Sequence, residues 1–343
     1  MNPVIQNLLT KKIPVKILVM GTSRKILKDC SHCLDIQKDC GTKEIVDGET
    51  WDRFASLTLE DVGKVVECFS SPQTLVLGVA SKVQAQLSWA LKKDKKHIIA
   101  YYEAFSPPET HSVVGRHPFF ANEFWVPLDS IVKDFEKLIK IPIKVVGQPS
   151  LETWAQESKF FKTEDIYFEI PQLKKESFKV LFAGGYGEGY EDSFRLFAQT
   201  SERLGDFQFL LSPHPKTDGT LEKNILKELP GNKLVIVPQR IGTMKAAFVS
   251  NVVVSQNSTV GLQALALNKA VIYLDHPKFG YTNFAIQRNL AKKVFSIEQL
   301  MQELVEIKKS PTMGYSDFSG MPKDSTEFIS THLIKLQKAN VRK

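Results

Sequence analysis

Two short segments in the second half of the chain place polar groups where a phosphate could bind. Residues 209–216 read Phe-Leu-Leu-Ser-Pro-His-Pro-Lys, so His214 follows an apolar run and lies between two prolines. A histidine in proline-restricted backbone can donate a hydrogen bond to a phosphate oxygen or transfer a proton. Residues 251–261 read Asn-Val-Val-Val-Ser-Gln-Asn-Ser-Thr-Val-Gly, where an apolar run meets hydroxyl and amide side chains before a helical pattern. Hydroxyls, free N–H groups and the helix dipole form a phosphate site at such a helix start.

Five residues of the second segment are candidate phosphate ligands: Ser255, Asn257, Ser258, Thr259 and Gly261. They would surround a phosphate at the first turn of the helix that follows. A plainer role is also open, because Ser258 or Asn257 could simply cap that helix. The two roles are compatible with each other.

A glycine-rich run forms a third candidate. Residues 184–189 read Gly-Gly-Tyr-Gly-Glu-Gly and lie between a strand pattern at 178–183 and a helix pattern at 192–204. Such a turn lets the backbone approach a ligand closely and points N–H groups at an anion. Gly185 and Gly187 therefore join the candidate phosphate ligands, although glycines also serve ordinary strand-to-helix turns.

The elements that would position these residues alternate between strand and helix. In the first half, apolar runs typical of strands buried on both faces occur at 15–20, 74–79, 98–102, 124–127 and 143–146. Helical spacing of apolar residues follows at 60–69, 84–92 and 130–139. In the second half, strand patterns occur at 178–183, 207–211, 234–237, 252–254 and 270–274. Strands and helices that alternate in this way predict a parallel sheet in each half. His214 would lie at the carboxyl end of its strand, where open α/β sheets bind ligands.

The length of 343 residues exceeds one ordinary core, so we expect two domains. The predicted fold is α/β, with two Rossmann-like domains that face each other across a cleft and a C-terminal helix that crosses back to the first domain. Residues 152–177 are aromatic, charged and irregular, which is typical of a connection. The expected parts are a first domain at 1–155, a connection at 156–177, a second domain at 178–322 and a basic helix at 323–343.

The composition indicates a globular protein with an excess of positive charge. Hydrophobic residues make up 43% of the chain, and 45 basic against 38 acidic residues give a net charge of +7. This charge favours an anionic partner, although a lysine-rich solvated surface would explain it equally well. No run approaches the ~20 apolar residues of a membrane span, and residues 2–16 lack a signal-peptide pattern. A cytoplasmic location is expected.

The four cysteines lie at positions 30, 33, 40 and 68. Cys30 and Cys33 have the C-x-x-C spacing of a zinc site, and His32 and Cys40 lie nearby. The segment reads as a helix after the first strand, and no second C-x-x-C pair exists. Free or buried thiols are therefore favoured over a metal site.

The succession of motifs in the second half resembles a known superfamily. A glycine-rich turn, a strand that ends in His-Pro and a strand-Ser-x-x-Ser-Thr-x-Gly-helix unit resemble the C-terminal domain of GT-B glycosyltransferases and their UDP-GlcNAc 2-epimerase relatives. Among the members of this superfamily, the capsule-polysaccharide and CDP-glycerol glycerophosphotransferase-like enzymes resemble these motifs most. In the first half, Gly147-Gln-Pro resembles the Gly-x-Pro segment that ends such first domains. These motifs are short, so they specify the fold better than the chemistry.

The resemblance implies that the second domain binds a nucleotide-sugar donor, with a UDP, CDP or CMP group. His214 and the helix start at Ser258 and Thr259 would hold its phosphates, with no metal and no further cofactor. The base or a phosphate would meet Gln239 and Arg240, although Arg240 could equally be a surface residue.

The first domain would bind the acceptor, a glycan or glycolipid. Glu103, at the carboxyl end of a strand, is the best candidate for the general base, although it could instead cap the following turn. The acceptor side would also include Thr22, Ser23, Arg24 and His117.

The sequence thus predicts a metal-independent GT-B glycosyltransferase that acts in surface polysaccharide synthesis. Two alternatives stay open: a sugar-nucleotide epimerase, and a non-catalytic protein that binds a glycan or another protein. The epimerase relatives have extra carboxylates and a Gly-Gly-containing turn that Gln256-Asn257 does not reproduce. The last helix is basic and could touch an anionic membrane as a peripheral contact. Its apolar face favours packing on the first domain instead, and no nucleic acid partner is expected.

Overall fold

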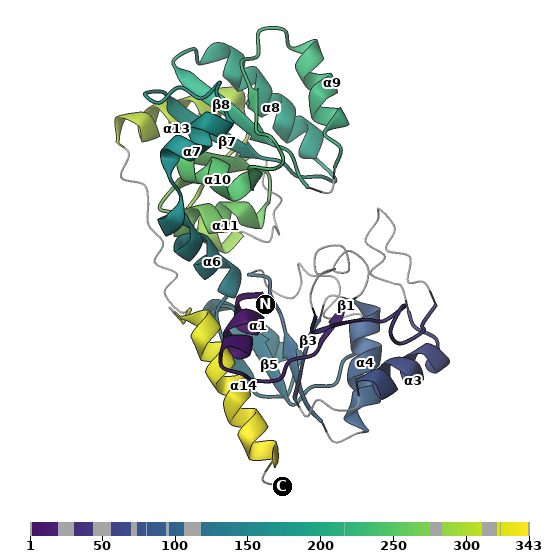
Figure 1. Ribbon diagram of the computed structural model, residues 1–343. Coiled ribbons are helices and arrows are strands. Elements are labelled where there is room, and N and C mark those ends of the chain that lie inside the picture. Colours follow the sequence, from purple (N-terminus) through teal and green to yellow (C-terminus); the bar gives the residue numbers. More distant parts are fainter. Residues whose placement is uncertain are drawn as a thin grey trace. The chain divides into compact units, whose positions relative to one another are not determined.

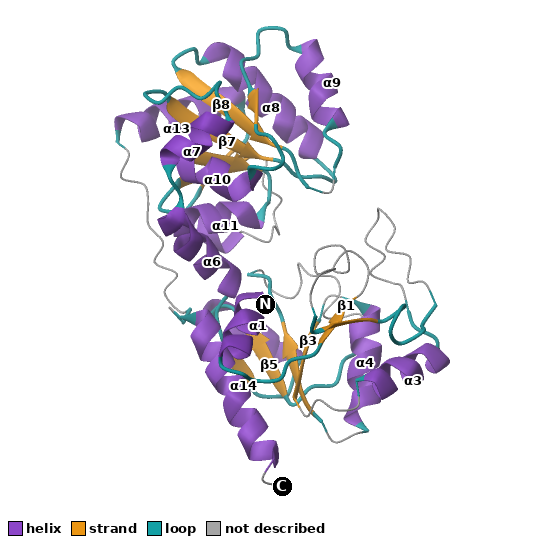
Figure 2. Cartoon of the chain, in the orientation of Figure 1, coloured by secondary structure: helices purple, strands orange, loops and turns teal. Residues whose placement is uncertain are grey.

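The computed structural model describes residues 2–19, 31–43, 56–69, 74–79, 81–93, 96–105, 118–215, 217–274, 283–310, 321–322 and 324–341. The chain forms two compact units (Figure 1). Unit 1 comprises Met1–Pro149 and Ser319–Lys343, and unit 2 comprises Ser150–Phe318. Figure 2 shows that both units combine strands with surrounding helices. Among the described residues, none of the helices has the length and apolar character that crossing a membrane requires.

Unit 1 is built on a parallel sheet with the strand order β3-β4-β5-β6. The strands are β3 (Thr74–Gly78), β4 (His97–Tyr101), β5 (Glu123–Val126) and β6 (Ile143–Val145). The helices that follow them in the chain are α4 (Lys82–Lys92), η2 (Asp129–Ile131) and α5 (Val132–Leu138), and α3 (Leu59–Cys68) precedes β3. Each strand overlaps a predicted apolar run, because a strand buried on both faces needs apolar residues at nearly every position.

A second, two-stranded sheet joins β1 (Ile17–Val19) and β2 (Cys33–Asp35) in parallel. The expectation of a helix around Cys33 is therefore wrong, because pairing with β1 outweighs the local pattern. Cys40 is buried, and burial together with the Cys68 thiol raises the pKa of Cys40 to about 12. Its thiol therefore stays protonated at neutral pH. Cys30 lies outside the described residues.

The first and last helices lie side by side on unit 1, purple and yellow in Figure 1. They are α1 (Asn2–Thr10), which sequence analysis did not identify, and α14 (Ser325–Val341). Val4 and Leu8 of α1 share an apolar cluster with Ile329 of α14 and with Trp125 of β5. The last helix thus packs on the first domain, as predicted.

Glu123 lies between two histidines in unit 1. Its Oε1 atom lies 2.9 Å from His97 Nε2, and its Oε2 atom lies 2.9 Å from His332 Nε2 and 3.1 Å from the donor Nε1 of Trp125. Lys144 Nζ lies 2.9 Å from His332 Nδ1. Since an ammonium only donates, Nδ1 accepts and Nε2–H donates to Glu123. These hydrogen bonds tie α14 to β4, β5 and β6.

This carboxylate should make unit 1 sensitive to acid. Burial alone would raise the pKa of Glu123, but hydrogen bonds from Trp125, His332 and His97 lower it below the ordinary 4.5. A carboxyl whose pKa is lowered on folding stabilises the protein above its unfolded pKa, and this contribution is lost as the pH falls through the folded-state pKa. We therefore expect the wild-type protein to lose more free energy of unfolding than Glu123→Gln between about pH 7 and about pH 3.5. Denaturant titrations at both pH values would measure it, and equal losses in the two proteins would contradict the prediction.

Unit 2 contains a six-stranded parallel sheet with the order β12-β11-β10-β7-β8-β9. The strands are β7 (Phe178–Ala183), β8 (Phe207–Ser212), β9 (Val235–Ile236), β10 (Val252–Ser255), β11 (Ala270–Leu274) and β12 (Lys292–Val294). Sequence analysis identified the first five. It missed β12, a short edge strand with two lysines, which pairs with β11 through the register Tyr273↔Lys293.

Helices cover both faces of this sheet. Residues of α8 (Tyr190–Arg203), α9 (Thr220–Glu228) and α13 (Ile297–Lys309) share a core with Phe182 and Val254. On the opposite face, Gly261 of α11 (Thr259–Ala266) packs against Tyr273, and Thr243 of α10 (Gly242–Val249) meets Ser212. A short helix, α12 (Asn283–Gln287), precedes β12.

The segment expected to be an irregular connection is largely helical. It contains α6 (Pro149–Glu157), η3 (Ser158–Phe160) and α7 (Thr163–Glu169). Leu151 and Trp154, three residues apart, are buried, as is Ile166. The many charged and aromatic residues concealed this apolar spacing.

Candidate functional site

The strand order of unit 2 reverses between β7 and β10. From β7 the chain proceeds to β8 and β9 on one side, and then crosses to β10, β11 and β12 on the other. The carboxyl ends of β7 and β10 are therefore the point at which the strand order of this sheet switches direction. Open α/β sheets bind ligands at this position. The three candidate segments from the sequence follow β7, β8 and β10, so the topology brings them to one edge of one sheet.

The loops after β7 and β8 are in close contact. Gly184 N donates to Ser212 O at 2.8 Å. A Cβ atom on Gly184 would lie 2.7 Å from His214 N and 2.8 Å from Ser212 O. Only glycine allows this approach of two backbones.

His214 is held by its own loop and by the turn after β7. Thr217 donates to the His214 carbonyl from both its backbone N and its Oγ1, each at 3.0 Å. The His214 ring meets Tyr186 edge to face, with centroids 4.7 Å apart and planes at 68°. The imidazole thus lies beside the tip of the glycine-rich turn.

Ser255 ends β10 with a hydroxyl that has no hydrogen-bond partner among the residues that the structure describes. The residue is 1% exposed, and its Oγ is buried without a hydrogen bond. In register, Ser255 pairs with Tyr273, and Ser212 pairs with Ala183. The Ser212 hydroxyl is satisfied, since its Oγ lies 2.8 Å from Thr243 Oγ1. A buried hydroxyl without a partner costs about 1–3 kcal/mol, and most buried polar groups in native proteins have a partner in the protein, a water or a ligand.

The turn after β10 leads into α11. Ser258 caps this helix, and its Oγ accepts from Val260 N at 3.2 Å. The first turn of α11 contains no acidic residue that would offset the positive end of its dipole. Asn257 and Thr259 flank the cap. Gly261 instead faces Tyr273, since a Cβ there would lie 2.3 Å from Tyr273 OH, so packing accounts for this glycine.

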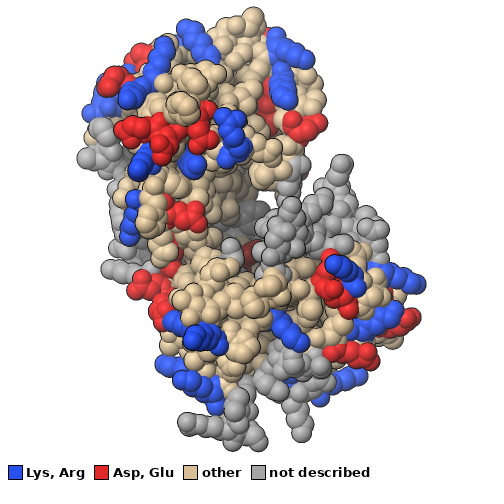
Figure 3. Space-filling view, viewed as in Figure 1, with Lys and Arg blue, Asp and Glu red and all other residues tan. Residues whose placement is uncertain are grey.

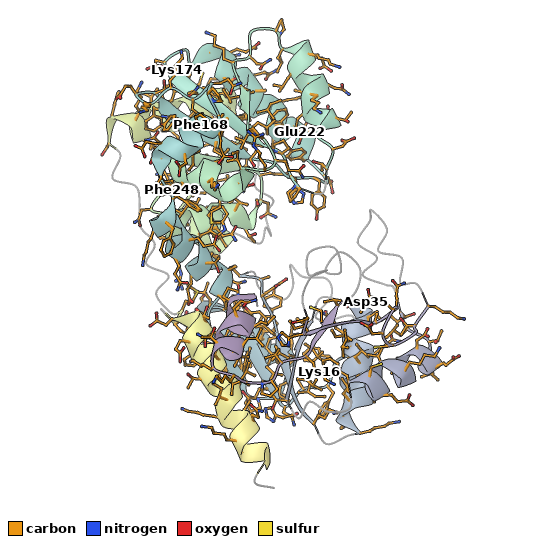
Figure 4. The ribbon with its side chains drawn as sticks, in the orientation of Figure 1. Lys16, Asp35, Phe168, Lys174, Glu222 and Phe248 are labelled. Carbon is orange, nitrogen blue, oxygen red and sulfur yellow. The ribbon has the colours of Figure 1, made fainter. Side chains whose placement is uncertain are left out.

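Two side-chain contacts at this edge were not identified from the sequence. Gln256 Nε2 donates to Glu188 O at 3.0 Å and joins the turns after β10 and β7. Behind the glycine-rich turn, the buried Tyr190 hydroxyl donates to Glu222 Oε1 at 2.7 Å. Glu222, labelled in Figure 4, lies on α9 beside α8. Glu222 lies near the start of a helix, and the surrounding sequence does not predict that its carboxylate would bond Tyr190, 32 residues away.

Gln239 and Arg240 follow β9, two strands away from β7. Arg240 Nε lies 3.6 Å from Glu169 Oε2 of α7, and its side chain is largely exposed. Lys245 pairs with the same carboxylate at 3.6 Å. Figure 3 shows acidic side chains gathered over α7, with Lys and Arg beside them. Contact of Gln239 and Arg240 with a base or phosphate stays a prediction.

Glu103 belongs to unit 1, where it follows β4 at the carboxyl edge of the sheet and is exposed. Gln148 Nε2 donates to the Glu103 carbonyl at 2.9 Å, and Tyr101 OH donates to Gln148 Oε1 at 3.1 Å. The backbone is therefore fixed while the carboxylate faces solvent. The other acceptor-side candidates, Thr22, Ser23, Arg24 and His117, lie outside the described residues.

A shallow cavity of about 410 Å³ lies at the opposite, amino-terminal edge of β7. Its basic lining includes Lys179, whose Nζ donates to Lys175 O at 3.0 Å and to Ser177 O at 2.8 Å. This ammonium is already satisfied by carbonyls. Lys308, also in the lining, pairs with Asp206. The carboxyl edge is the better candidate for a ligand site.

The chain matches no known protein-family model. No curated protein matches it in sequence. Solved structures share its fold: UDP-GlcNAc 2-epimerase from Neisseria meningitidis bound to UDP-GlcNAc has a TM-score of 0.71 at 13% identity, over 97% of this chain and 95% of that chain. UDP-GlcNAc 2-epimerase from Methanocaldococcus jannaschii has a TM-score of 0.69 at 16% identity, over 97% and 95% of the two chains.

Sucrose-phosphate synthase from Thermosynechococcus elongatus is also similar, with a TM-score of 0.52 at 14% identity over 82% of this chain and 77% of that chain. At these identities the likeness establishes the fold. The predicted fold class, two Rossmann-like α/β domains of the GT-B type, is confirmed. The closer resemblance to capsule-polysaccharide and CDP-glycerol enzymes stays a prediction.

Proposed function

We propose that this protein is an enzyme that binds a nucleotide sugar at the β10–α11 turn and transfers the sugar to a glycan or glycolipid acceptor. The observation that supports it best is the buried, unpartnered Ser255 hydroxyl at the point where the strand order reverses. A phosphate oxygen would supply the missing acceptor. The adjacent start of α11 contains Ser258 and Thr259 and no acidic residue, so it also favours a negatively charged group such as a phosphate.

In this proposal the residues have distinct roles. Glu103 takes the proton of the acceptor hydroxyl, whose oxygen attacks the anomeric carbon of the sugar. The bond from that carbon to the diphosphate oxygen breaks, and its electron pair leaves with the diphosphate. His214 and the α11 helix start stabilise the charge that develops on the leaving group.

Epimerisation of a nucleotide sugar is the second candidate. The fold likeness to two UDP-GlcNAc 2-epimerases over 97% of this chain favours it, compared with 82% for the synthase. An epimerase needs no acceptor. Incubation with UDP-GlcNAc alone, followed by NMR of the sugar stereochemistry, separates the two: an epimer formed without acceptor would rule out the transferase.

A nucleotide screen tests both enzymatic candidates against a non-catalytic binding protein. UDP, CDP, CMP and GDP would each be added in a thermal-shift assay. A ligand at about 100 times its Kd stabilises the folded state by about 2.7 kcal/mol, which is a readily measured rise in Tm. If none of the four shifts the Tm, both enzymatic candidates fail.

Ser255→Ala should separate ligand binding from stability. Removal of a buried, unsatisfied hydroxyl should leave the free energy of unfolding of the ligand-free protein unchanged or raise it by about 1 kcal/mol. The affinity for the nucleotide that binds in the screen should fall by about 5- to 10-fold. Denaturant unfolding and calorimetry measure the two effects.

Ser250→Ala is the matched control. Ser250 is equally buried, but its Oγ donates to Ala246 O at 2.7 Å. Its removal should leave nucleotide affinity unchanged. If Ser255→Ala destabilised the ligand-free protein without a change in affinity, the hydroxyl would be structural.

A further inference from the structure

The turn between β7 and α8 differs chemically from the phosphate site beside it. Tyr186 at its tip is 54% exposed, although an aromatic side chain usually buries most of its surface. One side of its ring contacts His214. The exposed ring area therefore lies directly beside the residue that we assign to the leaving diphosphate.

The first amide of this turn is already used inside the protein. Gly184 N donates to Ser212 O at 2.8 Å. Gly185 packs on the ring of Tyr190, whose hydroxyl donates to Glu222. The Gly184 N–H is therefore not available to a phosphate, unlike the amides of a typical glycine-rich phosphate loop.

The charges around the turn also disfavour an anion. Glu188 is exposed on the turn, and Glu191 and Asp192 occupy the first turn of α8. Glu222 is buried behind them. The nearby Arg195 pairs with Glu191 at 2.9 Å and with a second carboxylate on α9. By contrast, the first turn of α11 has no acid.

An exposed aromatic residue, followed two residues later by an exposed carboxylate, matches an uncharged sugar. The apolar C–H face of a pyranose buries against such a ring, and its hydroxyls donate to a carboxylate. Resting on the proposed function, we infer that the β7–α8 turn holds the sugar of the nucleotide sugar, with the ring against Tyr186 and hydroxyls toward Glu188. This reassigns Gly185 and Gly187 from the phosphate to the sugar.

The neighbouring turn supports this division. Gln256 Nε2 donates to Glu188 O at 3.0 Å and links the two turns, one residue after the unpartnered Ser255 hydroxyl. Adjacent strand ends lie about 4.8 Å apart, which is the scale that separates a sugar ring from the phosphate attached to it. A phosphate at α11 would therefore place its sugar at the β7–α8 turn.

The test compares each nucleotide with its sugar conjugate. Binding of UDP, UDP-GlcNAc, CDP and CDP-glucose would be measured by calorimetry for the wild type, Tyr186→Ala and Glu188→Gln. Tyr186→Ala should weaken binding of the sugar conjugate by about 10-fold, and that of the free nucleotide by less than about 2-fold. Glu188→Gln should weaken the conjugate by about 5-fold. Phe160→Ala, at an aromatic residue that is 84% exposed away from the site, should change neither.

The outcomes separate this inference from the function on which it rests. If the variants bound nucleotide and conjugate equally more weakly than the wild type, or bound both as tightly as the wild type, the sugar assignment would be overturned. The proposal that the protein binds a nucleotide would still hold. If the wild type bound none of the four compounds, the proposed function would fail first. Both side chains are exposed, so an unchanged Tm would confirm that the variants fold.

Discussion

His214→Ala should lower turnover by about 10²- to 10³-fold, because it removes the group that stabilises the departing diphosphate. The same change should cost less than about 1.5 kcal/mol of folding free energy, since an edge-to-face pair such as that with Tyr186 contributes at most about that much. The measurements are kcat from release of the nucleotide and the free energy of unfolding from denaturant titration.

His332→Ala is the matched control for this prediction. His332 is also a partly buried histidine with an aromatic contact, to Trp125 at 5.6 Å, but it lies on α14 in unit 1. Its loss should lower stability and leave kcat within about 2-fold, as for substitutions away from a site. If His214→Ala instead lost stability and turnover in equal measure, His214 would be a structural residue.

Gly184→Ala should damage both the fold of the site and its activity. The new Cβ would lie 2.7 Å from His214 N and 2.8 Å from Ser212 O, and both are backbone atoms that no rotamer change can move. Overpacking of this kind costs about 1–3 kcal/mol. Because relief must displace the His214 loop, and a misplacement of about 1 Å can cost about 10²-fold in rate, kcat should fall by about that factor.

Gly205→Ala tests whether the position matters rather than the residue type. Apart from its two chain neighbours, no heavy atom of the described residues lies within 4 Å of a Cβ built at Gly205, between α8 and β8. This substitution should change the free energy of unfolding by less than about 0.5 kcal/mol and leave kcat unchanged. A stable, fully active Gly184→Ala protein would show that the two loops can separate without consequence for the site.

The strands of the sheets could be predicted from sequence because of how they are buried. β7 and β11 were identified to the residue, since β11 is an unbroken apolar run and β7 is interrupted only by Lys179. β2 and β12 were missed, because each is three residues long and draws its stability from a neighbouring strand rather than from its own side chains. Helix α1 was missed for a similar reason. Its two buried residues, Val4 and Leu8, are buried by packing with α14, which is distant in the sequence.

The candidate site also contains residues that the local sequence predicts and contacts that it does not. His214 and Ser255 could be placed at strand ends because Ser255 directly follows an apolar run and His214 follows one by three residues, and parallel strands bring their carboxyl ends to one edge. The Gln256–Glu188 contact spans 68 residues and the Tyr190–Glu222 contact spans 32. No local pattern records such pairs. The missing partner of Ser255 is likewise visible only once every neighbour is in place.

The placement of α14 has a consequence for how the protein is made. Residues 319–343 belong to unit 1, yet they leave the ribosome after all of unit 2. Until then, Val4, Leu8 and Trp125 lack Ile329, the α14 residue that is fully buried in their cluster. Domains usually fold as units in the order of synthesis. Here the half that is translated first is completed last, so its uncovered apolar face is exposed to chaperones and to aggregation for as long as unit 2 takes to emerge.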